Sequence, residues 1–254
     1  MDVNKPEEPS PLEQANYWDA WNARWREATD LSRRVQKQVA LFMLWLRSLG
    51  RMDMKVLDVG CGSGWLCAML LPFGMVTGID FTEEVLSRAR SRNPEVRYIT
   101  GDFFDAGFKN EFDVVVSMEV ISHITDQSAF IHKCWEALKP GGYLMLATQN
   151  KYVYEHRAET VSPSPSQVRK WLTPRTLRKV LEPEFEILKV TSVYPDGHKG
   201  LLRFVNSPRF NRLVAHVVPQ EQLDGLKERM LLGMTLMALA QKPMDAAPAE
   251  VRLS

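Results

Sequence analysis

A glycine-rich turn preceded by an acidic residue is the part of this sequence best suited to ligand chemistry. An apolar run ends at residue 59, the glycine-rich turn follows at 60–64, and Asp58 stands two residues before its first glycine. Glycines at a strand-to-helix junction let the backbone approach a ligand closely, and the first turn of the following helix offers unpaired N–H groups. The pattern predicts a nucleotide site built from Asp58, Gly60, Cys61, Gly62 and Gly64.

The same turn argues against a dinucleotide ligand. The fingerprint G-x-G-x-x-G would need glycine at position 65, where the chain has Trp65, and the carboxylate of Asp58 would repel a pyrophosphate. A ligand with a cationic head suits Asp58 better. S-adenosylmethionine carries an ammonium and a sulfonium group beside an adenosine, so it is the favoured cofactor, and a hydride-transferring NAD enzyme is disfavoured.

Further cofactor contacts are predicted at the ends of the next strands. Asp80 follows the turn by about twenty residues, where an acid accepts hydrogen bonds from a ribose diol, and Asp102 could accept from the adenine amino group. A single acid could instead be a helix cap or a turn residue, but three acids in register behind a glycine turn favour a binding site. The predicted contacts are Asp80, Phe81 as a stacking ring, Gly101, Asp102, Phe103, and Met118 with Glu119 at the methionine end.

Two histidines are candidate general bases, which a hydroxyl group that reacts as a nucleophile needs because it must lose its proton. His123 follows the fourth predicted strand, where the acceptor should lie, although a histidine there could also be structural and bond to backbone. His198 lies in a glycine-flanked loop and is either a second base or a solvated turn residue.

Four further residues are expected to contact the acceptor, the molecule that reacts with the cofactor. Gln149 and Asn150 come just after the fifth predicted strand and could hydrogen-bond acceptor or cofactor. Arg203 and Arg209 could pair with an anionic acceptor such as a sugar phosphate or a carboxylate, since arginine binds such groups bidentately. In the alternative, both arginines belong to solvated surfaces.

Aromatic residues recur at helical spacing near the N-terminus, in a helix that Ser10 and Pro11 open as cap and first turn. Such a stripe usually faces a core, but it could also close over the cofactor as a lid, because aromatic faces suit a sulfonium or ammonium cation. The stripe comprises Tyr17, Trp18, Trp21 and Trp25, and the first two are predicted cofactor contacts.

Strands and helices alternate through the rest of the chain, which predicts an α/β fold with a mostly parallel sheet covered by helices on both faces. Strands are expected at 55–59, 75–79, 96–100, 112–117, 142–148, 185–194 and 235–241. Helices are expected at 30–49, after Ser63, after Thr82, at 127–138, from Thr173 to 183, and from Ser207 and Gln220.

The predicted organisation is one domain with attachments. Residues 1–50 form an N-terminal helical cap, residues 51–244 form the cofactor-binding domain, and residues 245–254 form a flexible tail. The connection at 195–232, between the last two strands, is unusually long and is predicted to be an inserted helical lid. An insert of this size could also make a homodimer contact.

Composition narrows the class of partner. The 254 residues carry a net charge of +1, which gives no electrostatic footprint for nucleic acid. Three cysteines without C-x-x-C spacing indicate neither disulfides nor a zinc site, so no metal is expected. The longest apolar run is too short to cross a membrane, and no signal-like segment precedes it. We therefore expect a cytoplasmic enzyme with a small-molecule acceptor.

The glycine turn resembles motif I of class I S-adenosylmethionine-dependent methyltransferases, and the resemblance extends through Lys139-Pro140-Gly141-Gly142. It implies a doubly wound, Rossmann-like, seven-stranded sheet. Within that class, the segment 118–126 resembles the ubiquinone-biosynthesis O-methyltransferases and their small-molecule relatives, which typically have Glu-x-x-Glu-His here. Ser122 replaces the second glutamate, so a metal-binding role is not carried over.

The resemblance implies methyl transfer without naming the acceptor. The favoured acceptor atom is a hydroxyl oxygen of a sugar, a phenol or a natural-product intermediate. Two alternatives remain: N-methylation of a small amine, which needs less help from a base, and a non-catalytic S-adenosylmethionine-binding subunit that regulates or accompanies another protein.

Overall fold

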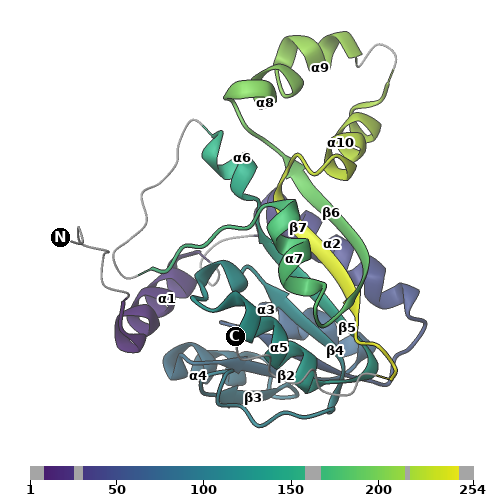
Figure 1. Cartoon of the computed structure of the whole chain (residues 1–254). Helices are drawn as coiled ribbons and strands as arrows, with labels where there is room; N and C mark the ends of the chain where they lie inside the picture. The colour runs from purple at the N-terminus through teal and green to yellow at the C-terminus, as the bar shows by residue number, and fades with distance from the viewer. Residues whose placement is uncertain (1–8, 26–30, 158–166, 215–217, 246–254) are drawn as a thin grey trace, which may run out of the picture.

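A computed structural model describes residues 9–25, 31–157, 167–214 and 218–245. Its centre is a seven-stranded sheet of order β3-β2-β1-β4-β5-β7-β6 (Figure 1). All neighbouring pairs from β3 to β5 are parallel, and β7 runs antiparallel to β5 and β6. This confirms the predicted mostly parallel, doubly wound sheet. The strands are β1 (Met54–Val59), β2 (Gly74–Asp80), β3 (Arg97–Thr100), β4 (Phe112–Met118), β5 (Leu138–Gln149), β6 (Glu186–Pro195) and β7 (Gly233–Gln241).

The central strands are almost continuously apolar because both faces of the sheet are covered. Successive side chains of a strand point to opposite faces, so Val56 and Val114 belong to one hydrophobic cluster while Leu57 and Val115 belong to the other. Helices α2 (Arg33–Ser48), α3 (Trp65–Leu70) and α4 (Glu83–Arg92) complete the first cluster, and α5 (Gln127–Ala137) and α7 (Pro174–Leu181) complete the second.

Helix boundaries follow local capping. The side chain of Ser32 accepts a hydrogen bond from Val35 N, so α2 begins at Arg33 and not at residue 30, which lies outside the described residues. The predicted apolar stripe of α2 is buried as expected. A capping box from Thr173 to Thr176, with Pro174 in the first turn, starts α7 where the sequence predicts it.

Two helical attachments flank the sheet. Helix α1 (Pro11–Trp25) lies beside its carboxyl edge, and α6 (Lys151–Glu155) follows β5. Helices α8 (Gly200–Val205), α9 (Pro208–Val214) and α10 (Gln220–Arg229) fill the predicted insertion between β6 and β7, and Figure 1 shows α8 and α9 projecting beyond the end of the sheet. Beyond residue 245 the predicted tail lies outside the described residues.

No helix among the described residues has the length and apolar character needed to cross a membrane.

Candidate functional site

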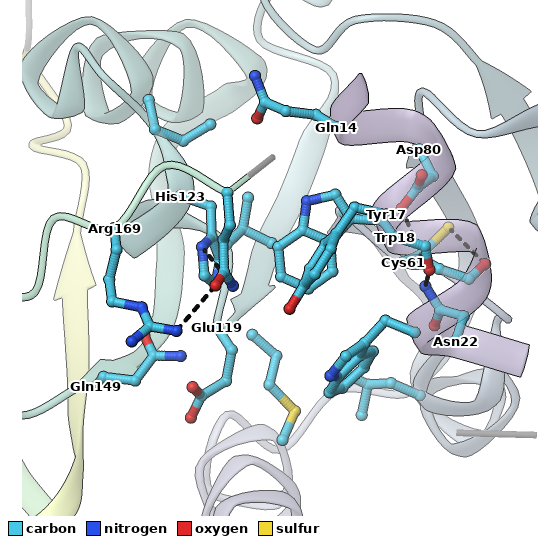
Figure 2. Close-up of a pocket in the computed structure, with 18 of the residues that line it drawn as sticks. Gln14, Tyr17, Trp18, Asn22, Cys61, Asp80, Glu119, His123, Gln149 and Arg169 are labelled. Carbon is cyan, nitrogen blue, oxygen red and sulfur yellow. Dashed lines mark hydrogen bonds between the residues drawn. The ribbon is translucent and has the colours of Figure 1, made fainter. Parts of the chain in front are cut away.

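A pocket of about 350 Å³ opens at the carboxyl ends of β1, β2, β4 and β5, which is where ligands bind in sheets of this kind. Figure 2 shows Asp80, Cys61 and Asn22 at one end, His123, Arg169, Glu119 and Gln149 at the other, and Tyr17 and Trp18 between them. Twelve of the residues predicted from the sequence line this pocket: Tyr17, Trp18, Asp58, Gly60, Cys61, Gly62, Asp80, Phe81, Met118, Glu119, His123 and Gln149.

The glycine turn has the backbone that only glycine adopts readily. Gly60, Gly62 and Gly64 have φ of 70°, 50° and 72°, in the left-handed region. A Cβ on Gly62 would stand 2.7 Å from Asn22 Oδ1, so a side chain there would meet helix α1. Gly62 N also donates to Asp80 Oδ2 at 2.9 Å, which fixes the turn against the end of β2.

Asp58 is a buried carboxyl group facing the pocket, with only 2% of its surface exposed. Burial raises its pKa to about 7, against the smaller opposing effect of a hydrogen bond from Cys67 Sγ to Asp58 Oδ2 at 3.3 Å. A buried carboxyl group with a raised pKa is stabilised in its ionised form by an approaching cation. Asp58 is therefore placed to bind the positively charged end of a ligand.

The acids predicted at the next strand ends divide into two groups. Asp80 lines the pocket and accepts from Gly62 N and Thr82 N. Asp102 is exposed and accepts from Phe104 N at 2.9 Å, so it closes a local turn. Phe103 is buried and packs on Phe130, with ring centroids 5.6 Å apart. Gly64, Gly101, Asp102 and Phe103 do not line the pocket, and their role as cofactor contacts stays a prediction.

Glu119 lies at the end of β4 in a left-handed conformation, with φ of 65°. Its Oε1 accepts from Arg34 Nη1 at 2.6 Å, from Gln38 Nε2 at 2.7 Å and from Thr235 Oγ1 at 3.1 Å. Its Oε2 is buried and has no hydrogen-bond partner among the described residues. One carboxylate oxygen is thus held by α2 and β7, and the other can accept a hydrogen bond from a ligand.

His123 ends a short 3₁₀ turn (Ile121–His123) and lines the pocket. Its Nδ1 lies 2.8 Å from the carbonyl oxygen of Val168, and because a carbonyl only accepts, Nδ1 carries the proton. Burial lowers its pKa from the usual 6.5, although Val168 and Glu119 oppose the shift. The ring is therefore neutral at neutral pH, and Nε2 holds the basic lone pair.

Helix α1 contributes a wall of the pocket. Tyr17, Trp18 and Trp21 all line it, and the Trp18 ring packs on His123 with centroids 4.6 Å apart. The side chain of Trp25 is not among those that the structure describes. An ion pair of 2.7 Å between Asp19 and Arg88 joins α1 to α4. These contacts favour the lid interpretation of the aromatic stripe over that of a core-facing helix.

Four predicted residues lie away from the pocket. Asn150 is fully buried, and its Nδ2 donates to the carbonyl oxygens of Leu231 and Gly233 at 2.9 and 2.8 Å, so it joins β5 to β7. His198 lies 3.3 Å from Asp196 in a second, open pocket beside α2. Arg203 and Arg209 are exposed on α8 and α9. No described residue of the insertion lines the main pocket.

The sequence analysis missed several residues of the pocket because they come from segments without a recognisable motif. Arg34 projects from α2, and Gln14 and Asn22 from α1. The largest missed group follows β5 and comprises Tyr154, Arg157, Gln167, Arg169 and Trp171. The alternation of 167, 169 and 171 was the one available signal, since every second residue of an extended segment faces the same side.

Neither a disulfide nor a metal centre is formed by the described residues around this pocket. Cys61, Cys67 and Cys134 are buried free thiols, and of these only Cys61 lines the pocket. Within the described part of the chain, no group of three or more His, Cys, Asp or Glu side chains is arranged to hold a metal ion.

Comparisons with known proteins agree with this geometry. A family model described as a methyltransferase domain matches residues 57–146. The chain is similar to the ubiquinone biosynthesis O-methyltransferase of Hydrogenovibrio crunogenus, with 32% identity over 59% of this chain and 65% of the relative. It is 30% identical to the same-named protein of Aromatoleum aromaticum over 50% of this chain and 58% of the relative. The chain thus spans less than two thirds of the length of these curated relatives.

Among solved structures, the N-methyltransferase NodS of Bradyrhizobium japonicum, in complex with S-adenosyl-L-homocysteine, has the same fold. The TM-score is 0.64 at 15% identity, and the alignment covers 91% of this chain and 99% of NodS. At this identity the likeness shows the fold alone.

Proposed function

We propose that the whole chain transfers a methyl group from S-adenosylmethionine to a hydroxyl oxygen of a small polar molecule, because residues 57–146 match a family model described as a methyltransferase domain. The observation that carries this proposal is the arrangement of one pocket. Asp58 and the glycine turn lie at one end, and a neutral histidine with a basic Nε2 lies at the other.

The residues present fit S-adenosylmethionine. Asp58 has a buried carboxyl group with a raised pKa, and a bound cation would stabilise its ionised form. Glu119 Oε2 is buried, has no hydrogen-bond partner among the described residues and can accept a hydrogen bond from the ligand. Asp80 and Phe81 line the adenosine end, where a carboxylate can accept from a ribose and a ring can stack on adenine. The aromatic rings of Tyr17, Trp18 and Trp21 suit a sulfonium.

S-adenosylmethionine supplies an electrophilic methyl group on a sulfonium sulfur. The acceptor hydroxyl would donate to His123 Nε2, which would take up its proton as the oxygen receives the methyl group, and the donor would leave as S-adenosyl-L-homocysteine. Val168 stabilises the resulting imidazolium through its hydrogen bond to Nδ1. The pocket walls hold donor and acceptor in line, an effect of up to about 7–11 kcal/mol on the barrier.

The neutral state of His123 favours an oxygen acceptor over the alternatives. An amine that is already unprotonated needs little help from a base, whereas a hydroxyl group gains about 10²- to 10⁴-fold from a positioned one. The non-catalytic alternative does not explain why a desolvated histidine with a fixed Nδ1 lines the pocket. The three free cysteines suit a reducing compartment, so we also propose a cytoplasmic location.

The test is a methyl-transfer assay that measures S-adenosyl-L-homocysteine by mass spectrometry with a panel of catechols, sugars and amines. Calorimetry with S-adenosylmethionine and NAD accompanies it. We expect S-adenosylmethionine to bind, NAD not to bind, and a hydroxylated compound to be methylated. His123→Ala should lower kcat by about 10²- to 10⁴-fold without changing the affinity for S-adenosylmethionine.

The matched control is His132→Ala. His132 is on α5, is paired with Glu184 and does not line the pocket. Methylation of amines alone would favour N-methylation, and binding without turnover would favour the non-catalytic alternative. Binding of NAD in place of S-adenosylmethionine would overturn the proposal altogether.

A further inference from the structure

Four side chains of the pocket wall pack against one another in a row, in the order Arg157, Tyr154, Trp171, Arg169, with the two rings tilted by 45°. The Arg157 guanidinium carbon lies 5.8 Å from the centre of the Tyr154 ring, the two ring centroids are 4.9 Å apart, and the Arg169 guanidinium carbon lies 5.1 Å from the centre of Trp171. All four line the pocket. We name this set the arginine–aromatic wall. Two cations are held on either side of a pair of rings, and stacking limits the number of conformations that each guanidinium can adopt.

The backbone that carries half of this wall is fixed to the rest of the site. Lys170 N donates to the Ser122 carbonyl at 2.7 Å, and Lys151 N donates to the Leu172 carbonyl at 2.9 Å. Two residues before Lys170, the Val168 carbonyl accepts from His123 Nδ1. Arg169 therefore follows directly the residue that holds the candidate base, and Figure 2 shows His123 and Arg169 facing the same cavity.

Among the described residues that line this end of the pocket are three arginines and one carboxylate, Glu119. Arg34, the third arginine of the lining, is paired with Glu119 at 2.6 Å. Arg157 is paired at 2.9 Å with Asp196, which lies outside this pocket. Arg169 Nη2 donates to Gln167 Oε1 at 2.9 Å. The remaining carboxyl groups of the lining, those of Asp58 and Asp80, lie at the glycine-turn end.

We propose that the methyl acceptor carries an anionic oxygen group, a carboxylate or a phosphate, which Arg169 and Arg157 bind while the acceptor hydroxyl meets His123. This inference rests on the proposed function and names its substrate class. A guanidinium presents planar N–H pairs that match both anions, and a prearranged guanidinium loses little conformational entropy on binding them. The anion contact expected of Arg203 and Arg209 thereby moves to two residues of the main pocket.

The experiment compares two acceptors that differ only in charge: 3,4-dihydroxybenzoate and its neutral isostere 3,4-dihydroxybenzamide. Their binding is measured by calorimetry in the presence of S-adenosyl-L-homocysteine. A third arm, 3,4-dihydroxyphenylphosphonate, distinguishes a phosphate-type anion from a carboxylate. We expect at least one anion to bind about ten- to hundredfold more tightly than the amide, the difference expected for charge-assisted hydrogen bonds.

Variants identify the residues responsible. Arg169→Met keeps an apolar chain that can pack on Trp171 but removes the charge, so it should remove most of the preference for the anion and leave binding of the amide within about twofold. Arg157→Met tests the other end of the wall independently, should the first variant not fold. The matched control, Arg175→Met, changes an exposed arginine on α7 that does not line the pocket.

Equal affinity of wild type for all three compounds, or no binding of either anion, overturns the inference. So does an equal loss for anion and amide in both wall variants. The assay for S-adenosyl-L-homocysteine distinguishes failure of the anionic-acceptor inference from failure of the proposed methyltransferase function. Methylation of all three compounds with equal kcat/KM refutes the anionic acceptor and leaves the methyltransferase standing. An anion preference without methylation of any compound refutes the methyltransferase and leaves the anion site standing.

Discussion

Replacement of Asp58 by asparagine is expected to weaken binding of S-adenosylmethionine and to remove part of its dependence on pH. Asp58 is buried, faces the pocket, and has a pKa raised to about 7 by burial. A cationic ligand binds the ionised carboxyl group, so binding near neutral pH requires loss of a proton from Asp58. Asparagine keeps the size of the side chain and removes the charge.

The magnitude follows from the pKa. With a pKa of about 7, Asp58 is about 90% ionised at pH 8 and about 10% ionised at pH 6. If only the ionised form binds, wild-type affinity falls about tenfold between pH 8 and pH 6. A charge-assisted hydrogen bond contributes about 1.5–3 kcal/mol, so Asp58→Asn should lose about ten- to hundredfold in affinity at pH 8.

Stability supplies a second readout with a definite sign. The folded-state pKa of Asp58 lies above the model value of 3.8, so its contribution to stability is present below pH 3.8 and is lost as pH rises through about 7. The difference corresponds to about 4 kcal/mol. Without ligand, Asp58→Asn should therefore be at least as stable as wild type at pH 8, and any loss of binding there would not reflect unfolding.

The assay is titration calorimetry with S-adenosylmethionine at pH 6, 7 and 8, in buffers with different heats of ionisation. Wild type should release about half a proton per ligand at pH 7, and Asp58→Asn should release less. Asp105→Asn is the matched control, since Asp105 is exposed and lies outside the pocket. If Asp58→Asn has wild-type affinity and the same proton release, the assignment of Asp58 to the cationic end is wrong.

Three further predictions concern other parts of the molecule. The pKa of His123 is lowered by burial, so the acid limb of kcat should lie below pH 6.5; a stopped-rate assay from pH 5 to 9 that finds it above this value would contradict a buried base. Tyr17→Ala combined with Trp18→Ala should weaken S-adenosylmethionine binding at least about tenfold, and unchanged affinity would make α1 a packing element only. Lys242→Met should lower the free energy of unfolding by about 1–3 kcal/mol in urea titrations, because the buried Lys242 ammonium donates to the carbonyl oxygens of Trp135 and Leu138, which would lose their donor. If the urea midpoint is unchanged, water donates to these two carbonyl oxygens in place of the Lys242 ammonium, and the prediction is wrong.

The main elements of the fold were predictable because each is encoded by a local pattern. The seven strands lie within a few residues of their predicted positions, since buried parallel strands read as short apolar runs between turn residues. Capping by Thr173 and Pro174 marked the start of α7. The start of α2 was misjudged because Ser32 caps it, and a sequence with several adjacent capping residues does not indicate which one is used.

The pocket could be predicted only in part. Asp58, Asp80 and Glu119 were found because strand ends meet at one edge of a parallel sheet, so position along the chain gives position in space. His198 and Asn150 do not line this pocket, for the opposite reason. Their surroundings depend on how β5, β7 and the insertion pack together, and no local pattern records that packing.

The sequence by itself determined the end of the pocket that holds the glycine turn. A turn with three left-handed glycines, directly after a strand whose second-last residue is an acid, is a local requirement of backbone geometry, and neighbouring residues are enough to specify it. The tertiary structure decided the opposite end of the pocket. Arg34, Arg157 and Arg169 come from three separate segments, and only long-range packing brings their charges to one pocket. The same packing buries Asp58 and His123, and burial sets the pKa values on which their chemistry depends.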